Sequence, residues 1–121
     1  GERNFAQSFH TGIDLAVPLD SPVRAAADGI VLKAGLAIPG APSASYGMMV
    51  VVANGPTTAT LYAHLQNRGR VPPVAPGQVV KRGQIIGYVG MTGLTSGPHL
   101  HFEVLVNDQP VNPRRFLPRG A

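Results

Sequence analysis

Apolar residues recur along the chain in short runs, and the run with the clearest alternation lies near its C-terminal end. In residues 98–106, apolar side chains alternate with His99, His101 and Glu103. Because successive side chains of a β-strand point to opposite faces, these three residues share one face of a predicted strand. Two imidazoles are therefore aimed into the same space.

The middle of the chain predicts two neighbouring strands joined by a turn. Residues 48–53 are wholly apolar, which is typical of a strand buried on both faces. The Asn-Gly pair at 54–55 is a strong hairpin signal, and the proline that follows it also allows a longer loop. Residues 58–65 then alternate, which puts Tyr62 and His64 on the polar face of their strand and the leucines on the other face.

Further segments complete the pattern of predicted elements. Residues 23–35 are interpreted as two short strands hinged at Asp28-Gly29, a pair suited to a type I′ hairpin turn. Residues 36–45 are rich in proline, glycine and serine, and they predict a loop of the kind that lines a binding site. Residues 77–90 predict a second hairpin of short strands, punctuated by glycine.

Composition supports a small domain rich in strands. The 121 residues include 15 glycines and 12 prolines, dispersed without a period, and 44% of the residues are hydrophobic. This apolar material suffices for one modest core, so residues 1–121 are predicted to form a single, mainly β domain with a tail at 114–121. The first motif lies so close to the start of the chain that we expect an upstream region to be missing.

The residue types that are absent narrow the chemistry. The chain has no cysteine, which excludes a disulfide framework and every cysteine-ligated zinc fold, and leaves histidine and carboxylate as the strong metal ligands. No apolar run approaches the roughly 18 residues that a membrane-spanning helix needs. No basic-then-apolar segment opens the chain as a secretion signal would, so we expect a soluble segment.

The charge balance favours an anionic partner. Ten Lys and Arg residues against six Asp and Glu residues give a formal net charge of +4, and several of the bases lie in loops or near the C-terminus. Such a balance favours adhesion to an anionic polymer, which is either nucleic acid or cell wall. The three tyrosines and four phenylalanines are scattered, without a basic and aromatic platform for base stacking, so we do not expect a nucleic-acid partner.

Four histidines and one aspartate are the candidate metal ligands. His10 and Asp14 are four residues apart, and in an extended chain such positions share a face. The candidates are thus His10, Asp14, His64, His99 and His101. Any three of these five residues would make the open, three-ligand zinc site that a hydrolase needs. Paired imidazoles also suit copper. Each motif taken alone is also compatible with the polar face of a surface strand.

Three motifs together carry a family resemblance. They are His-Thr-Gly-Ile-Asp at 10–14, Tyr-Ala-His-Leu at 62–65, and Gly-Leu-Thr-Ser-Gly-Pro-His-Leu-His-Phe-Glu at 93–103. In this order they resemble the signatures of the lysostaphin/LytM-type zinc peptidases, and the similarity runs from His10 to Pro113. One turn differs, because the usual Thr-Gly-x-Ser-Thr-Gly is Thr-Gly-Leu-Thr-Ser-Gly here.

This resemblance implies an antiparallel, sandwich-like β-sheet fold with little helix, whose groove holds one zinc ion. It implies an endopeptidase of the cell envelope that cuts peptide bonds in the cross-links or stem peptides of peptidoglycan. Matched motif by motif, His10, Asp14 and His101 would be the zinc ligands, and His64 and His99 would be the two catalytic histidines.

The chemistry leaves some roles open. Zinc lowers the pKa of bound water toward 7, so a histidine that is not a ligand can take a proton from this water. The other such histidine can donate a hydrogen bond to the oxyanion of the tetrahedral intermediate. We assign the base to His99, with an exchange of roles with His64 as the alternative. Glu103 either orients a ligand histidine or is an ordinary surface carboxylate. Some relatives carry an oxyanion-binding tyrosine upstream of the first ligand, whereas this chain has no tyrosine before Tyr46.

Two functions from other classes are the alternatives. A wall-binding or regulatory module could share the fold, but such a module would be expected to lack one or more of the five site residues. Residues 77–90 resemble half of a biotinyl or lipoyl carrier barrel, but Lys33 and Lys81 do not lie at a hairpin tip, where such a carrier has its modified lysine.

If the chain is a peptidase, the loops at 36–45 and 66–76 would determine which bond is cut.

Overall fold

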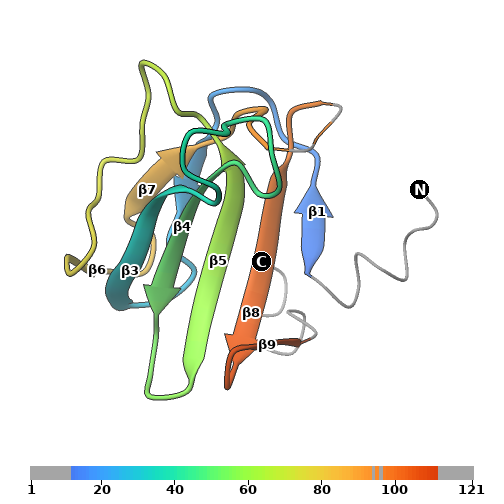
Figure 1. Ribbon diagram of the computed structural model, residues 1–121. Coiled ribbons are helices and arrows are strands. Elements are labelled where there is room, and N and C mark those ends of the chain that lie inside the picture. Colours follow the sequence, from blue (N-terminus) through green and yellow to red (C-terminus); the bar gives the residue numbers. More distant parts are fainter. Residues whose placement is uncertain (1–11, 94, 96, 112–121) are drawn as a thin grey trace.

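The computed structural model of the chain describes residues 12–93, 95 and 97–111. Within them the chain forms nine strands and no α-helix (Figure 1), as the strand-rich composition predicts. The described residues thus contain no helix with the length and apolar character that crossing a bilayer requires. The strands are β1 (Ile13–Leu15), β2 (Pro22–Arg24), β3 (Gly29–Leu36), β4 (Met48–Ala53), β5 (Thr58–Leu65), β6 (Val79–Val80), β7 (Ile85–Tyr88), β8 (Leu100–Val106) and β9 (Gln109–Val111).

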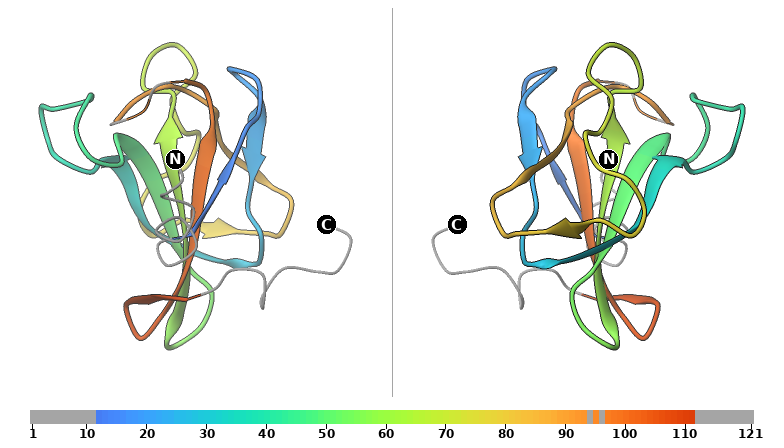
Figure 2. Two further views of the ribbon diagram at one scale, coloured as in Figure 1. Left: turned by 90° about the vertical axis from the view of Figure 1, so that its right-hand side faces the viewer. Right: turned by 90° about the vertical axis from the view of Figure 1, so that its left-hand side faces the viewer.

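Two sheets make up the fold. Seven strands form an antiparallel sheet in the order β1-β8-β5-β4-β3-β6, with β9 also paired to β8. The remaining strands, β2 and β7, form a separate antiparallel pair. This pair lies to one side of the large sheet, and the loop between β3 and β4 projects on the opposite side (Figure 2). The predicted antiparallel, sandwich-like architecture is confirmed.

The main core lies between the two sheets, because alternate residues of the central strands point toward the small sheet. Phe102 and Val104 of β8 are buried in this core, on the strand face opposite His101 and Glu103, as the alternation predicts. The two faces of β4 are both covered, since Val50 faces the main core and Met49 belongs to a second cluster. That second cluster lies on the other face of the large sheet and consists of Met49, Leu61 and Ala63, with Ala37, Tyr46, Val51 and Leu105 packed against it.

Both faces of β5 are buried, so the polar face that the sequence predicts for this strand is wrong. Tyr62 is buried in the main core, where its hydroxyl donates to Thr60 Oγ1 at 3.0 Å and accepts from the Ala26 amide at 2.9 Å. The alternation then breaks at His64, whose φ of 62° lies in the left-handed region. His64 therefore reaches its position through a backbone kink and not through the two-residue period of a strand.

Two of the predicted hairpins are wrong. The Asp28-Gly29 pair does not turn β2 back onto β3, because β2 pairs with β7 while β3 pairs with β4 and β6. The two strands of residues 77–90 separate in the same way, since β6 joins the large sheet and β7 the small one. β2, β6 and β7 are two to four residues long and form few hydrogen bonds, so burial of their apolar side chains decides which partner each of them joins.

The turns at the ends of the long strands follow the sequence more closely. The Asn-Gly pair at 54–55 connects the antiparallel strands β4 and β5, in a loop of residues 54–57 that includes the proline. β8 ends at Asn107 and Asp108, whose φ values of 52° and 63° make a tight reversal into β9. The alternating run at 98–106 predicts the end of β8, whereas β9 is not predicted from the sequence.

Candidate active site

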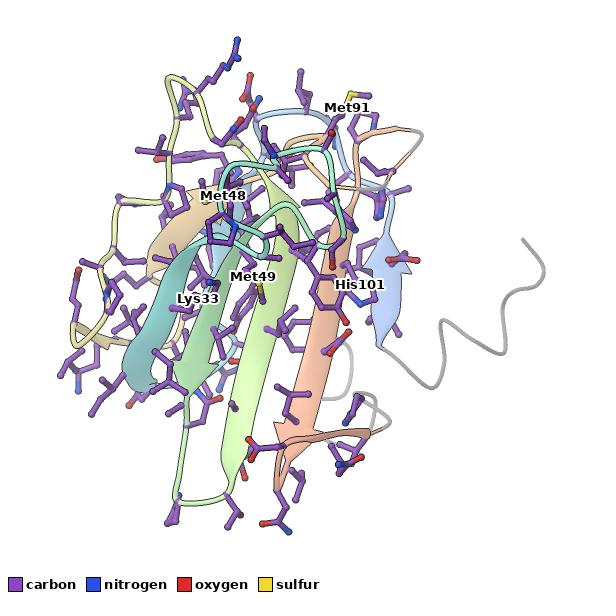
Figure 3. The ribbon with its side chains drawn as sticks, in the orientation of Figure 1. Lys33, Met48, Met49, Met91 and His101 are labelled. Carbon is purple, nitrogen blue, oxygen red and sulfur yellow. The ribbon has the colours of Figure 1, made fainter. Side chains whose placement is uncertain are left out.

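Four of the five sequence-predicted site residues meet at one end of the large sheet. In the pairing of β1 with β8, Asp14 stands opposite His101. In the pairing of β5 with β8, Ala63 stands opposite His101 on its other side, which brings His64 next to the same position. His99 immediately precedes β8. Figure 3 shows His101 on the upper part of β8, beside β1.

Asp14 lies within contact distance of both histidines of the His-x-His motif. Its Oδ1 is 2.7 Å from His101 Nδ1 and 3.6 Å from His99 Nε2. The Asp14 side chain is 44% exposed, whereas that of His101 is 9% exposed. The Asp14 carboxylate therefore lies on the solvent-exposed side of the site, and the His101 ring lies on its buried side.

The other edge of the His101 ring is held from below. His101 Nε2 is 2.8 Å from Oε2 of Glu103, and the Tyr46 hydroxyl donates a hydrogen bond to the same oxygen. The Tyr46 ring also stacks on His101, with centroids 5.4 Å apart and planes 20° apart. Because Glu103 is only 2% exposed, the surface-carboxylate interpretation of this residue is wrong.

Each ring nitrogen of His101 lies beside a carboxylate oxygen, Nδ1 beside Asp14 Oδ1 at 2.7 Å and Nε2 beside Glu103 Oε2 at 2.8 Å. A carboxylate accepts hydrogen bonds and a neutral imidazole carries one N–H, so the neutral ring can donate to only one of these two partners. Burial lowers the pKa of His101, but its hydrogen bonds with Glu103 and Asp14 raise this pKa more, and the net direction is upward. A positive charge is therefore favoured between Nδ1 and Asp14, as a proton or as a metal ion.

The donor set fits zinc, which takes imidazole nitrogen and carboxylate oxygen as ligands. Asp14 and His101 supply one of each, and the third predicted ligand, His10, lies outside the described residues. Among residues 12–93, 95 and 97–111, no three histidine, aspartate or glutamate side chains are placed to hold a metal by themselves. The described part of the chain thus supplies two of the three predicted ligands.

His64 is fixed at the end of β5 by its surroundings. Its Nδ1 lies 2.7 Å from the carbonyl oxygen of Thr92, which can only accept, so Nδ1 carries the proton and Nε2 is left without one. The amide of His64 donates to the carbonyl oxygen of Tyr46 at 2.9 Å. Burial lowers the pKa of His64, and this favours the neutral ring with a free Nε2 lone pair.

His99 is held in a similar way from the loop before β8. Its Nδ1 lies 3.0 Å from the carbonyl oxygen of Gly97 and 2.9 Å from Thr95 Oγ1, and its Nε2 is the atom near Asp14. The His99 and His64 ring centroids are 4.7 Å apart. The two predicted catalytic histidines therefore stand side by side, each with Nδ1 bound to a backbone carbonyl.

Two glycines allow the segments around His64 to approach one another. A Cβ on Gly93 would come within 2.7 Å of His64 Nδ1 and within 2.5 Å of the Ser45 oxygen, and a Cβ on Gly47 would come within 2.3 Å of the Gly93 nitrogen. The φ values are +81° at Gly93 and +64° at Gly47. Glycine is required at both positions because only its backbone can pass so closely in this conformation.

The sequence pattern did not point to Tyr46, Thr92 or Thr95. Tyr46 follows directly on the loop at 36–45, which was predicted to line a binding site, so the loop itself was the available signal. The two threonines lie in the glycine-rich turn that belongs to the third family motif, and the motif alone does not show what they contact. Their roles depend on which atoms reach the histidine rings, and spacing along the chain does not contain that information.

Comparison with protein families gives one match that covers most of the chain. The model of peptidase family M23 matches residues 8–113. The DD-carboxypeptidase/endopeptidase Mpg of Neisseria meningitidis serogroup B is 44% identical over 105 residues. The peptidoglycan DD-endopeptidase ShyC of Vibrio cholerae is 41% identical over 105 residues. Each alignment covers 87% of this chain and 22% of the relative, so the chain spans about a fifth of the length of these relatives.

Solved structures give the same picture. A zinc-containing peptidase from Vibrio cholerae has a TM-score of 0.74 and 39% identity, over 85% of this chain and 29% of that one. The catalytic domain of lysostaphin from Staphylococcus simulans has a TM-score of 0.76 and 31% identity, over 88% of this chain and 77% of that one. The likeness to lysostaphin that the three sequence motifs indicate is confirmed.

Proposed function

The chain belongs to peptidase family M23, and on that basis we propose that it is a zinc-dependent endopeptidase acting on peptide bonds in the cross-links or stem peptides of bacterial peptidoglycan. The observation that carries the proposal is the convergence of Asp14, His64, His99 and His101 from three separate parts of the chain. Hydrolysis by a metallopeptidase needs both metal ligands and unligated proton-transfer groups, and this cluster offers both.

The proposed metal ligands are His10, Asp14 and His101. Support comes from the position of His101 Nδ1, which lies 2.7 Å from the Asp14 carboxylate, and from the match of His10 to the first family motif. Three protein ligands would leave a further position for water and substrate. When bound, zinc would lower the pKa of water and polarise the scissile carbonyl.

The proposed proton-transfer groups are His99 and His64. We assign the base to His99, because its Nε2 is the atom near Asp14 and therefore beside the proposed metal position. His64 has its own Nε2 free in the same space, where it can hydrogen-bond to the carbonyl oxygen once the ring takes up a proton. Burial lowers the pKa of His64, whereas negative charge developing on that oxygen would raise it again.

The proposed substrate and location rest on the relatives. ShyC is a peptidoglycan DD-endopeptidase, and it is similar to nearly the whole of this chain while being several times longer. Peptidoglycan lies in the cell envelope, so we place the protein there. The loop that ends at Tyr46 and the connection between β5 and β6 lie near the site end of the sheet (Figure 1), and we propose that they select the bond.

Digestion of purified sacculi tests this function directly. We expect the zinc-loaded protein to release fragments with new peptide amino and carboxyl ends, identified by mass spectrometry. Incubation with a chelator should abolish release, and added zinc should restore it, because the proposed ligands hold the metal reversibly. New reducing sugar ends without new peptide ends would contradict the proposal, since they would mark a glycosidase.

Activity is expected to fall on the acid side of neutrality. Zinc binding requires a neutral imidazole and an ionised carboxylate, and the base must also be neutral, so protons compete at each of these groups. The ordinary histidine pKa of about 6.5 places the loss near that pH. Because burial lowers the pKa of His64 below its ordinary value, protonation of this residue should not set the upper edge of the loss. Rates of sacculus digestion against pH would measure it, and full activity at about pH 4 would contradict the histidine site.

A further inference from the structure

We infer that Tyr46 and Glu103 are positioning residues that hold His101 with its Nδ1 directed at the metal, an inference that rests on the ligand set proposed above. Oε2 of Glu103 accepts two hydrogen bonds, one from His101 Nε2 at 2.8 Å and one from the Tyr46 hydroxyl. When one ring nitrogen of a histidine binds a metal and the other donates a hydrogen bond to a carboxylate, the ring is fixed in one tautomer and becomes a more basic ligand.

The burial of Glu103 makes this arrangement specific. The carboxylate is 2% exposed, so water cannot satisfy Oε2 in place of its two partners. The Tyr46 hydroxyl is the donor of the second hydrogen bond to this oxygen. Tyr46 thereby fixes the orientation of the carboxylate, and the carboxylate fixes the orientation of the ring.

Tyr46 also connects the two halves of the site. Its ring stacks on His101, while its backbone carbonyl accepts a hydrogen bond from the amide of His64 at 2.9 Å. The loop that carries it is fastened at both ends, because the Ala37 amide donates to the Gly47 carbonyl at 2.8 Å and the Met48 amide donates to Thr92 Oγ1 at 2.9 Å. One residue of a surface loop therefore contacts a proposed ligand and a proposed catalytic histidine.

The test separates the hydroxyl of Tyr46 from its ring. Tyr46→Phe keeps the stacking and the backbone contact but removes the donor to Glu103, and Glu103→Gln keeps the side-chain length but removes the charge. Zinc affinity, measured by competition with a chromophoric chelator, should fall about 10–100-fold in each variant, the usual effect of losing such a partner. Glu103→Met, which offers no acceptor of comparable strength, should lose at least as much as Glu103→Gln.

A matched control is available in Tyr62, an interior tyrosine whose hydroxyl also makes two hydrogen bonds, one with the Ala26 amide and one with Thr60. Tyr62→Phe should lower the melting temperature and leave zinc affinity within about twofold of the wild type, because its partners lie in the main core. The tautomer of His101 in the zinc-loaded protein, read from its ¹⁵N chemical shifts, should carry the proton on Nε2 in the wild type. In the Glu103→Met variant, the same ¹⁵N chemical shifts should show that the hydrogen bond of Nε2–H is weaker.

The outcomes distinguish this inference from the proposed function. If the wild type binds zinc and digests sacculi, but Tyr46→Phe and both Glu103 variants keep wild-type zinc affinity, the positioning role is wrong and the function stands. An equal loss of affinity in Tyr62→Phe would also overturn the inference, since it would reflect general destabilisation. If the wild type neither binds zinc nor digests sacculi, the proposed function itself fails.

Discussion

Replacing His101 with alanine is expected to abolish zinc binding and hydrolysis together. His101 is one of three proposed ligands, and its ring is the part of the site that is buried and held on both edges, by Asp14 at Nδ1 and by Glu103 at Nε2. With it gone, two ligands remain and Glu103 keeps a buried carboxylate that has lost a donor. Metal content after chelation and reconstitution, and release of peptide from sacculi, would both be measured.

Folding must be checked in the same experiment, because a buried histidine also packs. Circular dichroism would establish that the His101→Ala variant retains its strands. Gln109→Ala is a suitable control, since this exposed residue lies on β9, which pairs with β8 far from the site. A folded His101→Ala protein that still binds one equivalent of zinc would refute the assignment of His101 as a ligand.

Replacing either unligated histidine is expected to separate zinc binding from hydrolysis. His99→Ala should keep zinc near one equivalent while the rate of sacculus digestion falls by roughly 10²–10⁴, the usual contribution of a general acid–base group. At position 64 the better substitution is His64→Asn, because the φ of 62° suits asparagine and strains alanine. It should likewise keep zinc and lose activity.

The comparison of adjacent positions gives this prediction its discrimination. His99 and His101 are two residues apart in sequence and both contact Asp14, so a general disturbance of the strand would affect both variants alike. Equal loss of zinc in His99→Ala and His101→Ala would refute the division of roles. A wall-binding module without catalysis predicts instead that none of these changes alters function, provided that the fold survives.

Local pattern determined the strands whose partners follow directly in the chain. β4 and β5 are apolar or alternating runs around an Asn-Gly turn, and they pair as predicted. The alternation of β8 correctly placed His101 and Glu103 on the face opposite Phe102, because the two-residue period of a strand is a geometric property of extended backbone. The strands β2, β3, β6 and β7 were recognised as strands but were given the wrong partners.

The candidate site divides in the same way. Asp14, His64, His99 and His101 could be selected from sequence, because imidazole and carboxylate are the metal and proton-transfer groups available in a chain without cysteine. Tyr46 could not be selected, since its value depends on a stacking distance of 5.4 Å to a residue 55 positions away, as the numbering of Tyr46 and His101 shows. His10 remains a prediction from sequence, outside the described residues.

The sequence by itself determined that this chain is rich in strands, that it carries the motifs of lysostaphin-type peptidases, and that its candidate site consists of histidines and a carboxylate. Only the tertiary structure decided how those residues are held: the kink at His64 that overrides strand periodicity, the buried Glu103 beneath His101, and the loop that brings Tyr46 onto both. The physical reason is that periodicity and composition act over neighbouring residues. Ring tautomers, hydrogen-bond partners and burial are set by groups that meet only when distant strands pair.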